Sequence, residues 1–193
     1  MTDSPSETQV DVAASSPGAE VAALVGSDEF SEDFGTIKVR VPSDRWVEAV
    51  TAARDGGFDF FSWLSAIDWA REVAVGDPVV EPEQMVERFE VLCRLSTTSD
   101  ARHVHLSTDL PRAVPSIASL VDVFPGASWH ERETAEMFGI VFEGHPNLEH
   151  LYLPDAFEGH PLRKSFPLLS REVKPWPGTV DVEDMPTTEN PEG

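Results

Sequence analysis

Residues 36–57 read TIKVRVPSDRWVEAVTAARDGG and predict a strand followed by a helix. Isoleucine and valine alternate with polar residues across 36–41, which is typical of a strand with one buried face. Pro42 ends the alternation, and Ser43 or Asp44 offers an N-cap oxygen. Apolar residues then recur at helical spacing up to the glycine pair, at Trp46, Val47, Val50 and Ala53. This stretch is therefore a β–α unit.

Three further stretches predict strands. Residues 58–69 are the most aromatic part of the chain and favour a strand, although their period also fits a helical turn. Residues 88–95 alternate again, and 103–107 follow a turn as their hairpin partner. In that last stretch Val104 and Leu106 are expected to point inward, and His103 and His105 outward.

Helices are predicted before and after these strands in the sequence. Residues 19–25 favour a short helix that ends at Gly26, and residues 129–138 favour another that ends at Gly139. A third, short helix is expected after Pro115-Ser116, from the apolar residues Ile117, Leu120 and Val121. The fold class is therefore α+β, a two-layer mixed β-sheet with packed helices.

The composition divides the chain into four parts. Residues 1–18 and 178–193 are predicted to be disordered acidic tails, because they lack an apolar period. Residues 19–140 form the α+β core domain. Glycine and proline interrupt residues 141–177, so this part is expected to be an extended interaction arm.

The charge and cysteine content exclude several classes of function. The formal net charge of −21 opposes binding to nucleic acid or anionic lipid. Cys93 is the only cysteine, so the chain alone can hold neither an intrachain disulfide nor an iron–sulfur cluster nor a thiolate zinc site. No apolar run reaches the length of a membrane span, and no signal or transit peptide is recognisable. A bacterial cytoplasmic origin is favoured.

Histidines and acidic residues suggest one rival function, a stand-alone metal-dependent hydrolase. His130-Glu131-Arg132-Glu133-Thr134 nearly matches the helical zinc motif HExxH, but Thr134 stands where the second histidine is required. Such a hydrolase would need His130, Glu133 and His145 to converge. The alternative is that the histidines at 130, 145, 150 and 160 are structural and fix turns.

Charged residues near the end of the core suggest contacts with a partner. On the helix, Arg132 is expected to pair with Glu136 four residues on, while Glu131 and Glu133 face either solvent or cations of a partner. Arg163 and Lys164 are an isolated basic pair, either docked on an acidic groove or merely solubilising. Nucleotide-binding, acyl-enzyme and dithiol motifs are missing, so no catalytic residue is assigned.

Three linked motifs resemble one family. They are WHERETAEMFGI at 129–140, FEGHPNL at 142–148 and GHPLRKSFP at 159–167, and together they resemble the 30-kDa subunit family of NADH-quinone oxidoreductase, which is respiratory complex I. The resemblance extends over residues 35–167. The residues expected to form the family motif and its interfaces are Glu131, Arg132, Glu133, Phe138, Gly139, Gly144, His145, Pro146, Gly159, Pro161, Leu162, Arg163, Lys164, Phe166 and Pro167.

The resemblance implies a non-catalytic structural or assembly subunit in the peripheral arm of a proton-translocating enzyme. It implies no catalytic residue, cofactor or metal in this chain, with FMN and iron–sulfur clusters held by other subunits. The implied partners are the quinone-site subunit and the iron–sulfur subunits, at the cytoplasmic face of the bacterial membrane, without nucleic acid and with only indirect membrane contact.

The sequence also departs from the family pattern. Ala135, Glu136, Glu149-His150 and Ser165 differ from the residues usual at these places. An equivalent subunit of an energy-converting hydrogenase or a deazaflavin-linked dehydrogenase therefore remains an alternative.

Overall fold

The computed structural model describes residues 16–71 and 85–167. Its main feature is a five-stranded mixed sheet in the order β1-β2-β5-β4-β3. The strands are β1 (Phe30–Asp33), β2 (Thr36–Arg40), β3 (Phe60–Trp69), β4 (Arg88–Ser96) and β5 (His103–Leu110). Only β2 and β5 pair in parallel within this sheet. The β–α unit predicted at 36–57 and the hairpin of β4 and β5 are thus confirmed.

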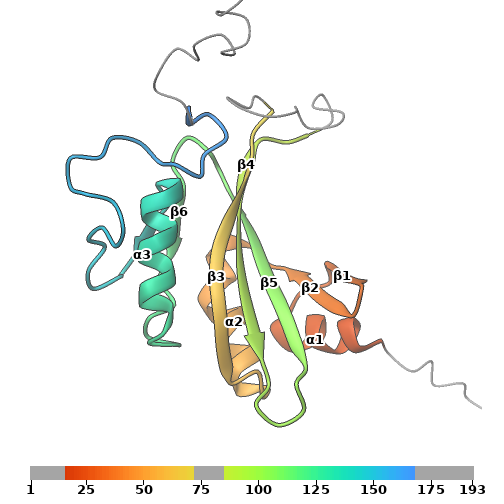
Figure 1. Cartoon of the computed structure of the whole chain (residues 1–193). Coiled ribbons are helices and arrows are strands. Elements are labelled where there is room, and N and C mark those ends of the chain that lie inside the picture. The colour runs from red at the N-terminus through yellow and green to blue at the C-terminus, as the bar shows by residue number, and fades with distance from the viewer. Residues whose placement is uncertain (1–15, 72–84, 168–193) are drawn as a thin grey trace, which may run out of the picture.

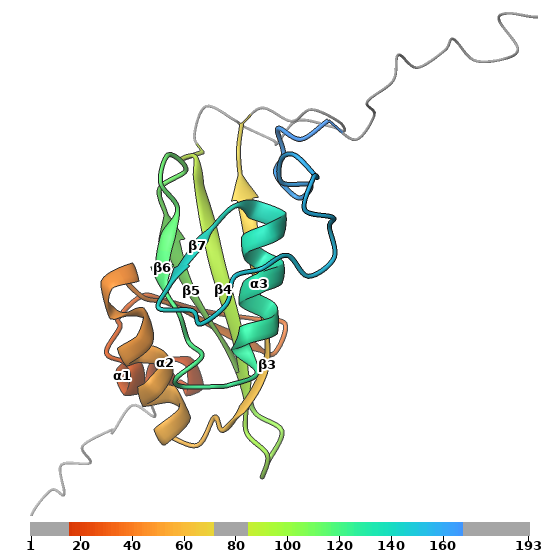
Figure 2. The same cartoon turned by 90° about the vertical axis from the view of Figure 1, so that its left-hand side faces the viewer.

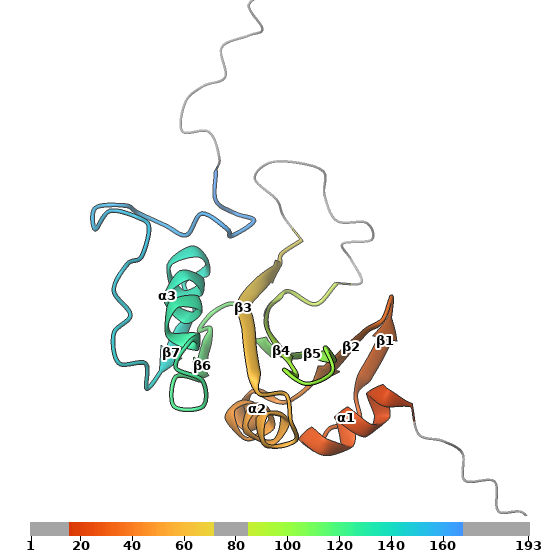
Figure 3. The same cartoon turned by 60° about the horizontal axis from the view of Figure 1, so that its bottom comes forward.

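Three helices pack on one face of this sheet (Figure 3). They are α1 (Pro17–Val25), α2 (Trp46–Asp55), which follows the short 3-10 turn η1 (Ser43–Arg45), and α3 (Ala127–Phe138). Apolar side chains of all three helices join one buried cluster with the inward side chains of the strands. The fold class predicted from the sequence is confirmed: two layers, with the core between helices and sheet (Figures 1 and 2).

The alternation within β4 shows how the sequence sets the two faces. Phe89, Val91, Cys93 and Leu95 are buried under the helices. The residues between them belong to the opposite face, because successive side chains of a strand point to opposite sides. On β5, Val104 and Leu106 lie in the core as predicted, so His103 and His105 lie on the opposite face.

The short helix expected after Pro115 is a wrong prediction. Ser116–Ala118 forms strand β6, which pairs in parallel with β7 (Val141–Glu143). The partner strand lies beyond α3 in the sequence, so local periodicity could not reveal it. Only one turn follows, in which the carbonyl of Leu120 accepts the N–H groups of Val123 and Phe124.

Two predicted boundaries move. Helix α1 begins at Pro17, because the Ser16 hydroxyl accepts the N–H of Ala19 as an N-cap, so the predicted tail loses its last residues. Strand β7 belongs to the core layer, although it falls in the predicted arm 141–177. Three parts of the predicted division lie outside the described residues: 1–15 of the first tail, 168–177 of the predicted arm, and the tail 178–193. The helices found in residues 16–71 and 85–167 lack the length and hydrophobicity of a membrane span.

Candidate docking site formed by helix α3 and the arm

The three sequence motifs lie on α3, on β7 and on residues 144–167. From here on, the arm means residues 144–167, the described part of the predicted arm that follows β7. The arm runs along the side of α3 that faces away from the sheet (Figures 1 and 3). Apart from turns it contains no regular element. Its path must therefore be fixed by side chains, and the contacts below show which ones do so.

The arm closes the C-terminal end of α3. The carbonyls of residues 136–138 would lack partners at a helix end. Instead they accept hydrogen bonds from His160 Nδ1 at 2.8 Å, from the Leu162 backbone N–H at 3.1 Å and from Arg163 Nε at 2.6 Å. The motif at 159–167 is thus a cap for the motif at 129–140, which explains why the two occur together.

Gly139 permits this cap. It has a φ of 71°, in the left-handed region. A Cβ atom built at this position would lie 2.4 Å from both Arg163 Nη2 and His160 Nε2. Glycine is therefore required for two reasons, the left-handed backbone conformation and the close approach of the two capping side chains.

We expect Gly139→Ala to lower the free energy of unfolding by about 2 kcal/mol or more, because the left-handed conformation alone costs about 1–2 kcal/mol for alanine. Displacement of His160 and Arg163 adds to this loss. Gly144→Ala is the matched control: its φ is 83°, but no atom lies within 4 Å of the added Cβ. Urea unfolding of both variants measures the difference, and equal losses would contradict the capping role.

Glu136 holds the middle of the arm. Its carboxylate accepts the backbone N–H groups of Leu151 at 3.1 Å, Tyr152 at 3.1 Å and Leu153 at 2.5 Å. Burial acts to raise the pKa of Glu136, but these N–H donors and nearby His150 outweigh it and lower the pKa. The carboxylate is therefore a charged anchor for three successive residues of the arm.

The predicted pair between Arg132 and Glu136 is wrong. The Arg132 guanidinium donates to the carbonyls of Glu149 and His150, both at 2.8 Å, and lies over the ring of Trp129. Both partners of the expected pair thus bind the backbone of the arm. Helical spacing could not show this, because the competing acceptors come from a segment without periodicity.

Glu131 is buried, contrary to the expectation that it faces solvent or a partner. It is 0% exposed, and its carboxylate accepts the Ser119 hydroxyl and the Leu120 N–H, both at 2.6 Å. Burial raises the pKa of Glu131 and outweighs these two hydrogen bonds. The residue links α3 to the segment after β6. Glu133 is partly exposed and makes no ion pair within the described ranges.

Asp68 joins the arm to the sheet. It is 3% exposed, forms an ion pair with Arg112 and accepts the Lys164 N–H at 2.9 Å. Arg112 and Arg163 both lie over the Phe89 ring, with their Cζ atoms 5.1 and 5.3 Å from the ring centroid. Burial, and for Arg112 also the neighbouring Arg163, lowers the pKa of both guanidinium groups.

Arg163 binds α3 of its own chain through Nε, and docking of the basic pair on an acidic groove of a partner stays a prediction. Lys164 forms no ion pair among the described residues, so a contact between its ammonium group and a partner stays a prediction. His160 has the structural role that the sequence analysis gave as an alternative, since it binds the backbone carbonyl of Glu136. Asp68 and Arg112 complete this cap, and sequence reasoning did not assign roles to them.

The remaining motif residues shape turns and contacts of the arm. His145 Nε2 lies 3.2 Å from the Ser128 hydroxyl, and its Nδ1 accepts the Asn147 N–H at 3.0 Å. The ring of Phe166 stacks on Phe157 at 5.9 Å. The others lie along the arm and its entry: Phe138 is buried, Pro161 is half-buried, and Gly144, Pro146, Gly159 and Pro167 are exposed.

The geometry does not assemble the rival metal site. His130, Glu133 and His145 all lie in the described part of the chain, where no group of three potential ligands is close enough to hold a metal ion. The His130 ring packs against Phe61 at 5.4 Å, and His145 is engaged with Ser128. These histidines therefore have structural contacts.

The sequence profile of the family described as the 30-kDa subunit of respiratory-chain NADH dehydrogenase matches residues 39–172, which include α3 and the arm. The chain belongs to this family. The C-type subunit of NADH-quinone oxidoreductase from Roseiflexus castenholzii is 38% identical over 154 residues, covering 78% of this chain and 79% of that protein. The family predicted from the three motifs is confirmed.

Other relatives extend the comparison. The combined C/D-type subunit of NADH-quinone oxidoreductase from Photorhabdus laumondii is 41% identical over 97 residues, which are 50% of this chain and 16% of that protein. A trypsin-resistant fragment of Nqo5 has a similar structure, with a TM-score of 0.51, 26% identity and coverage of 62% of this chain and 89% of the fragment. An archaeal membrane-bound sulfane sulfur reductase contains a chain of the same fold, with a TM-score of 0.63, 20% identity and coverage of 90% and 92%.

Proposed function

We propose that this chain is a non-catalytic assembly subunit in the peripheral arm of a proton-translocating NADH–quinone oxidoreductase. The observation that carries the proposal is the match to the C-type subunit of R. castenholzii over 78% of this chain and 79% of that protein. The geometry of the arm supports it, because Arg132, Glu136 and Arg163 of the motifs bind backbone groups and so fix the path of the arm.

The outer surface of α3, β7 and the arm is suited to protein contacts. It carries large apolar side chains that are exposed in the isolated chain: Trp129, Val141, Leu148, Tyr152 and Leu162. Exposed apolar groups on a rigid surface with a polar rim mark interaction sites. The hydrogen bonds of Glu136 and Arg163 hold the backbone beneath Tyr152 and Leu162, so these two side chains are presented in a fixed arrangement.

We propose specific partners and place them by their chemistry. The name of the P. laumondii relative joins a C-type and a D-type subunit in one protein, which favours a D-type, quinone-site subunit as a direct neighbour of this chain. Iron–sulfur subunits are the other proposed neighbours, and they would hold the clusters, since Cys93 is the only cysteine of this chain and is buried. FMN would likewise be held by another subunit, as family membership implies. The complex would lie at the cytoplasmic face of the membrane.

The experiment is purification of the complex from native membranes through a tag on this chain. We expect the other subunits to co-purify, and the double variant Tyr152→Asp/Leu162→Asp to reduce their yield at least about tenfold, as for the loss of an interface hot spot. Phe34→Asp, at a fully exposed side chain in the β1–β2 turn, is the matched control. A wild-type chain that purifies alone would refute the proposal.

A further inference from the structure

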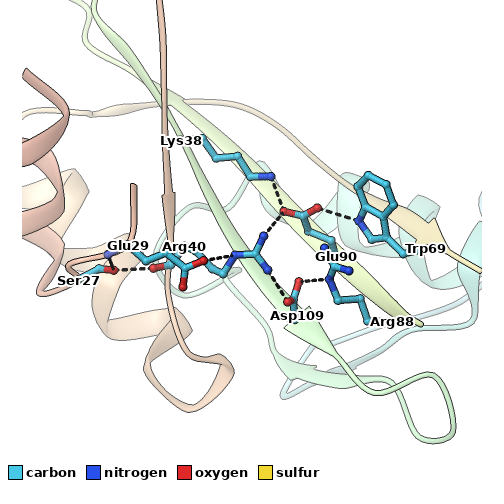
Figure 4. Close-up of polar contacts among 8 residues, drawn as sticks. All are labelled: Ser27, Glu29, Lys38, Arg40, Trp69, Arg88, Glu90 and Asp109. Atoms are coloured by element: carbon cyan, nitrogen blue, oxygen red, sulfur yellow. Dashed lines mark hydrogen bonds and ion pairs between the residues drawn. The ribbon is translucent and has the colours of Figure 1, made fainter. Parts of the chain in front are cut away.

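The sheet face opposite the helices has an end where charges compensate one another. Glu90 is 0% exposed, pairs with Lys38 at 2.5 Å and accepts Trp69 Nε1–H at 2.9 Å. Asp109 pairs with Arg88 at 2.9 Å and with Arg40 (Figure 4). Burial raises the pKa of Glu90, but its hydrogen bonds to Lys38 and Trp69 outweigh burial and lower it. This network needs no outside partner.

The other end of the same face is different. Trp63, Arg94, His105 and Lys38 stand opposite one another on β3, β4, β5 and β2, and so form one cross-strand row. The next row is Phe60, Ser96 and His103. We call Phe60, Trp63, Arg94, His103 and His105 the basic end.

Among the residues that the structure describes, no carboxylate pairs with Arg94, His103 or His105. Arg94 makes no ion pair within residues 16–71 and 85–167, and Lys38 is engaged with Glu90. The Nε2 atom of His105 is buried without a hydrogen-bond partner in this part of the chain. Burial, Arg94, His103 and Lys38 lower the pKa of His105, which favours its neutral imidazole. Arg94 is thus a cation that forms no ion pair within the described ranges, and it stands opposite His105, whose Nε2 lacks a hydrogen-bond partner there.

Apolar surface accompanies these cations. Phe60 is 54% exposed at the start of β3, and the Trp63 ring packs against His105 at 5.5 Å. None of the three helices covers them, since all pack on the other face (Figure 3). The basic end therefore offers an arginine and aromatic rings side by side, residue types that are enriched at protein interfaces.

We propose that the basic end docks an acidic segment of a neighbouring subunit, whose carboxylates face Arg94, His103 and His105 and whose apolar side chains cover Phe60. The proposal rests on the proposed function, because it assumes a multi-subunit complex. Carboxylates would supply the ion pair that Arg94 lacks within residues 16–71 and 85–167. A second copy of this chain is disfavoured as the occupant, because two chains of net charge −21 repel each other.

The first test places a photo-crosslinker in the intact complex, by Phe60→p-benzoylphenylalanine. We expect one dominant crosslink, to a segment of another subunit in which Asp and Glu outnumber Lys and Arg. A crosslink to a neutral or basic segment, to residues 72–84 of the same chain or to a second copy would overturn the proposal. So would no crosslink at all in a complex that contains the variant.

The second test is charge reversal, with the yield of co-purified subunits as the readout. Arg94→Glu is expected to reduce the yield about tenfold, because a like charge then faces the acidic segment, and Arg94→Lys to keep most of it. Arg54→Glu, on the helix-covered side, is the control. Equal yields for Arg94→Glu and Arg54→Glu overturn the docking proposal alone, whereas a wild-type chain that brings down no other subunit overturns the proposed function. If Arg94→Glu does not fold, the crosslink decides.

Discussion

Asp68→Ala is expected to lower the free energy of unfolding by about 3 kcal/mol, because it removes one partner of a buried ion pair. The Asp68 side chain is 1% exposed, and that of Arg112 is 26% exposed. Without the carboxylate, Arg112 keeps its charge in a largely buried place over the Phe89 ring. The Lys164 N–H also loses its acceptor, so the arm loosens together with the sheet. Urea unfolding followed by tryptophan fluorescence measures the loss.

Two further variants separate the causes of this loss. Asp68→Asn keeps an oxygen for the Lys164 N–H but removes the charge, so we expect an intermediate loss. Asp55→Ala removes an ion pair with Arg54 in which the carboxylate side chain is 64% exposed, and its effect should stay within about 0.5 kcal/mol. If Asp68→Ala lowered the free energy of unfolding no more than Asp55→Ala, the contacts of Asp68 between sheet and arm would not stabilise the fold.

Strands and helices with one buried face could be predicted from the sequence, because burial imposes a period that neighbouring residues share. The alternation in 36–41 and 88–95 placed β2 and β4 within one or two residues. The helical spacing after Pro42 placed α2, and the glycines at 26 and 139 marked the ends of α1 and α3. These signals are local, so a single sequence is enough to find them.

Contacts between distant segments could not be predicted in this way. Asp68 lies 44 residues from Arg112 and 96 residues from Lys164, and nothing in the local sequence connects them. Strand β6 is predicted as a helix for the same reason, since its partner β7 follows a whole helix later. The motif at 159–167 does mark a site of contact, but its basic residues suggest a partner where Arg163 in fact caps α3.

Glu131 and Glu136 show the same limit for two carboxylates on one helix. Their helical positions predict a charged, exposed or interfacial face, yet both are buried, with opposite effects on pKa. Glu131 is enclosed by the core and receives two hydrogen bonds, so burial dominates. Glu136 receives three backbone N–H groups from the arm, so hydrogen bonding dominates. The pKa values of the two residues therefore shift in opposite directions because segments distant in the sequence give Glu136 more hydrogen-bond donors than Glu131.

Glu136→Gln is therefore expected to release the middle of the arm at neutral pH. The amide keeps one acceptor oxygen but presents an NH2 group to backbone N–H donors, so at least one of them is left unpaired. The expected loss is about 2 kcal/mol, which corresponds to about thirtyfold faster hydrogen exchange at residues 151–153. Glu131→Gln is the control, because an amide can accept the Leu120 N–H and donate to the Ser119 hydroxyl.

The carboxyl groups of Glu136 and Glu131 have opposite effects on how stability depends on pH. A carboxyl group with a lowered native pKa stabilises the fold above its ordinary pKa of about 4.5, and this contribution is lost as the pH falls through the native value. Protection of residues 151–153 should therefore fall with acidification in the wild type but change little in Glu136→Gln. Glu131 has a raised native pKa, so its ionisation costs stability as the pH rises, and Glu131→Gln should be at least as stable as the wild type at pH 7. Identical pH profiles for the two variants would show that the arm is not held by the charge of Glu136.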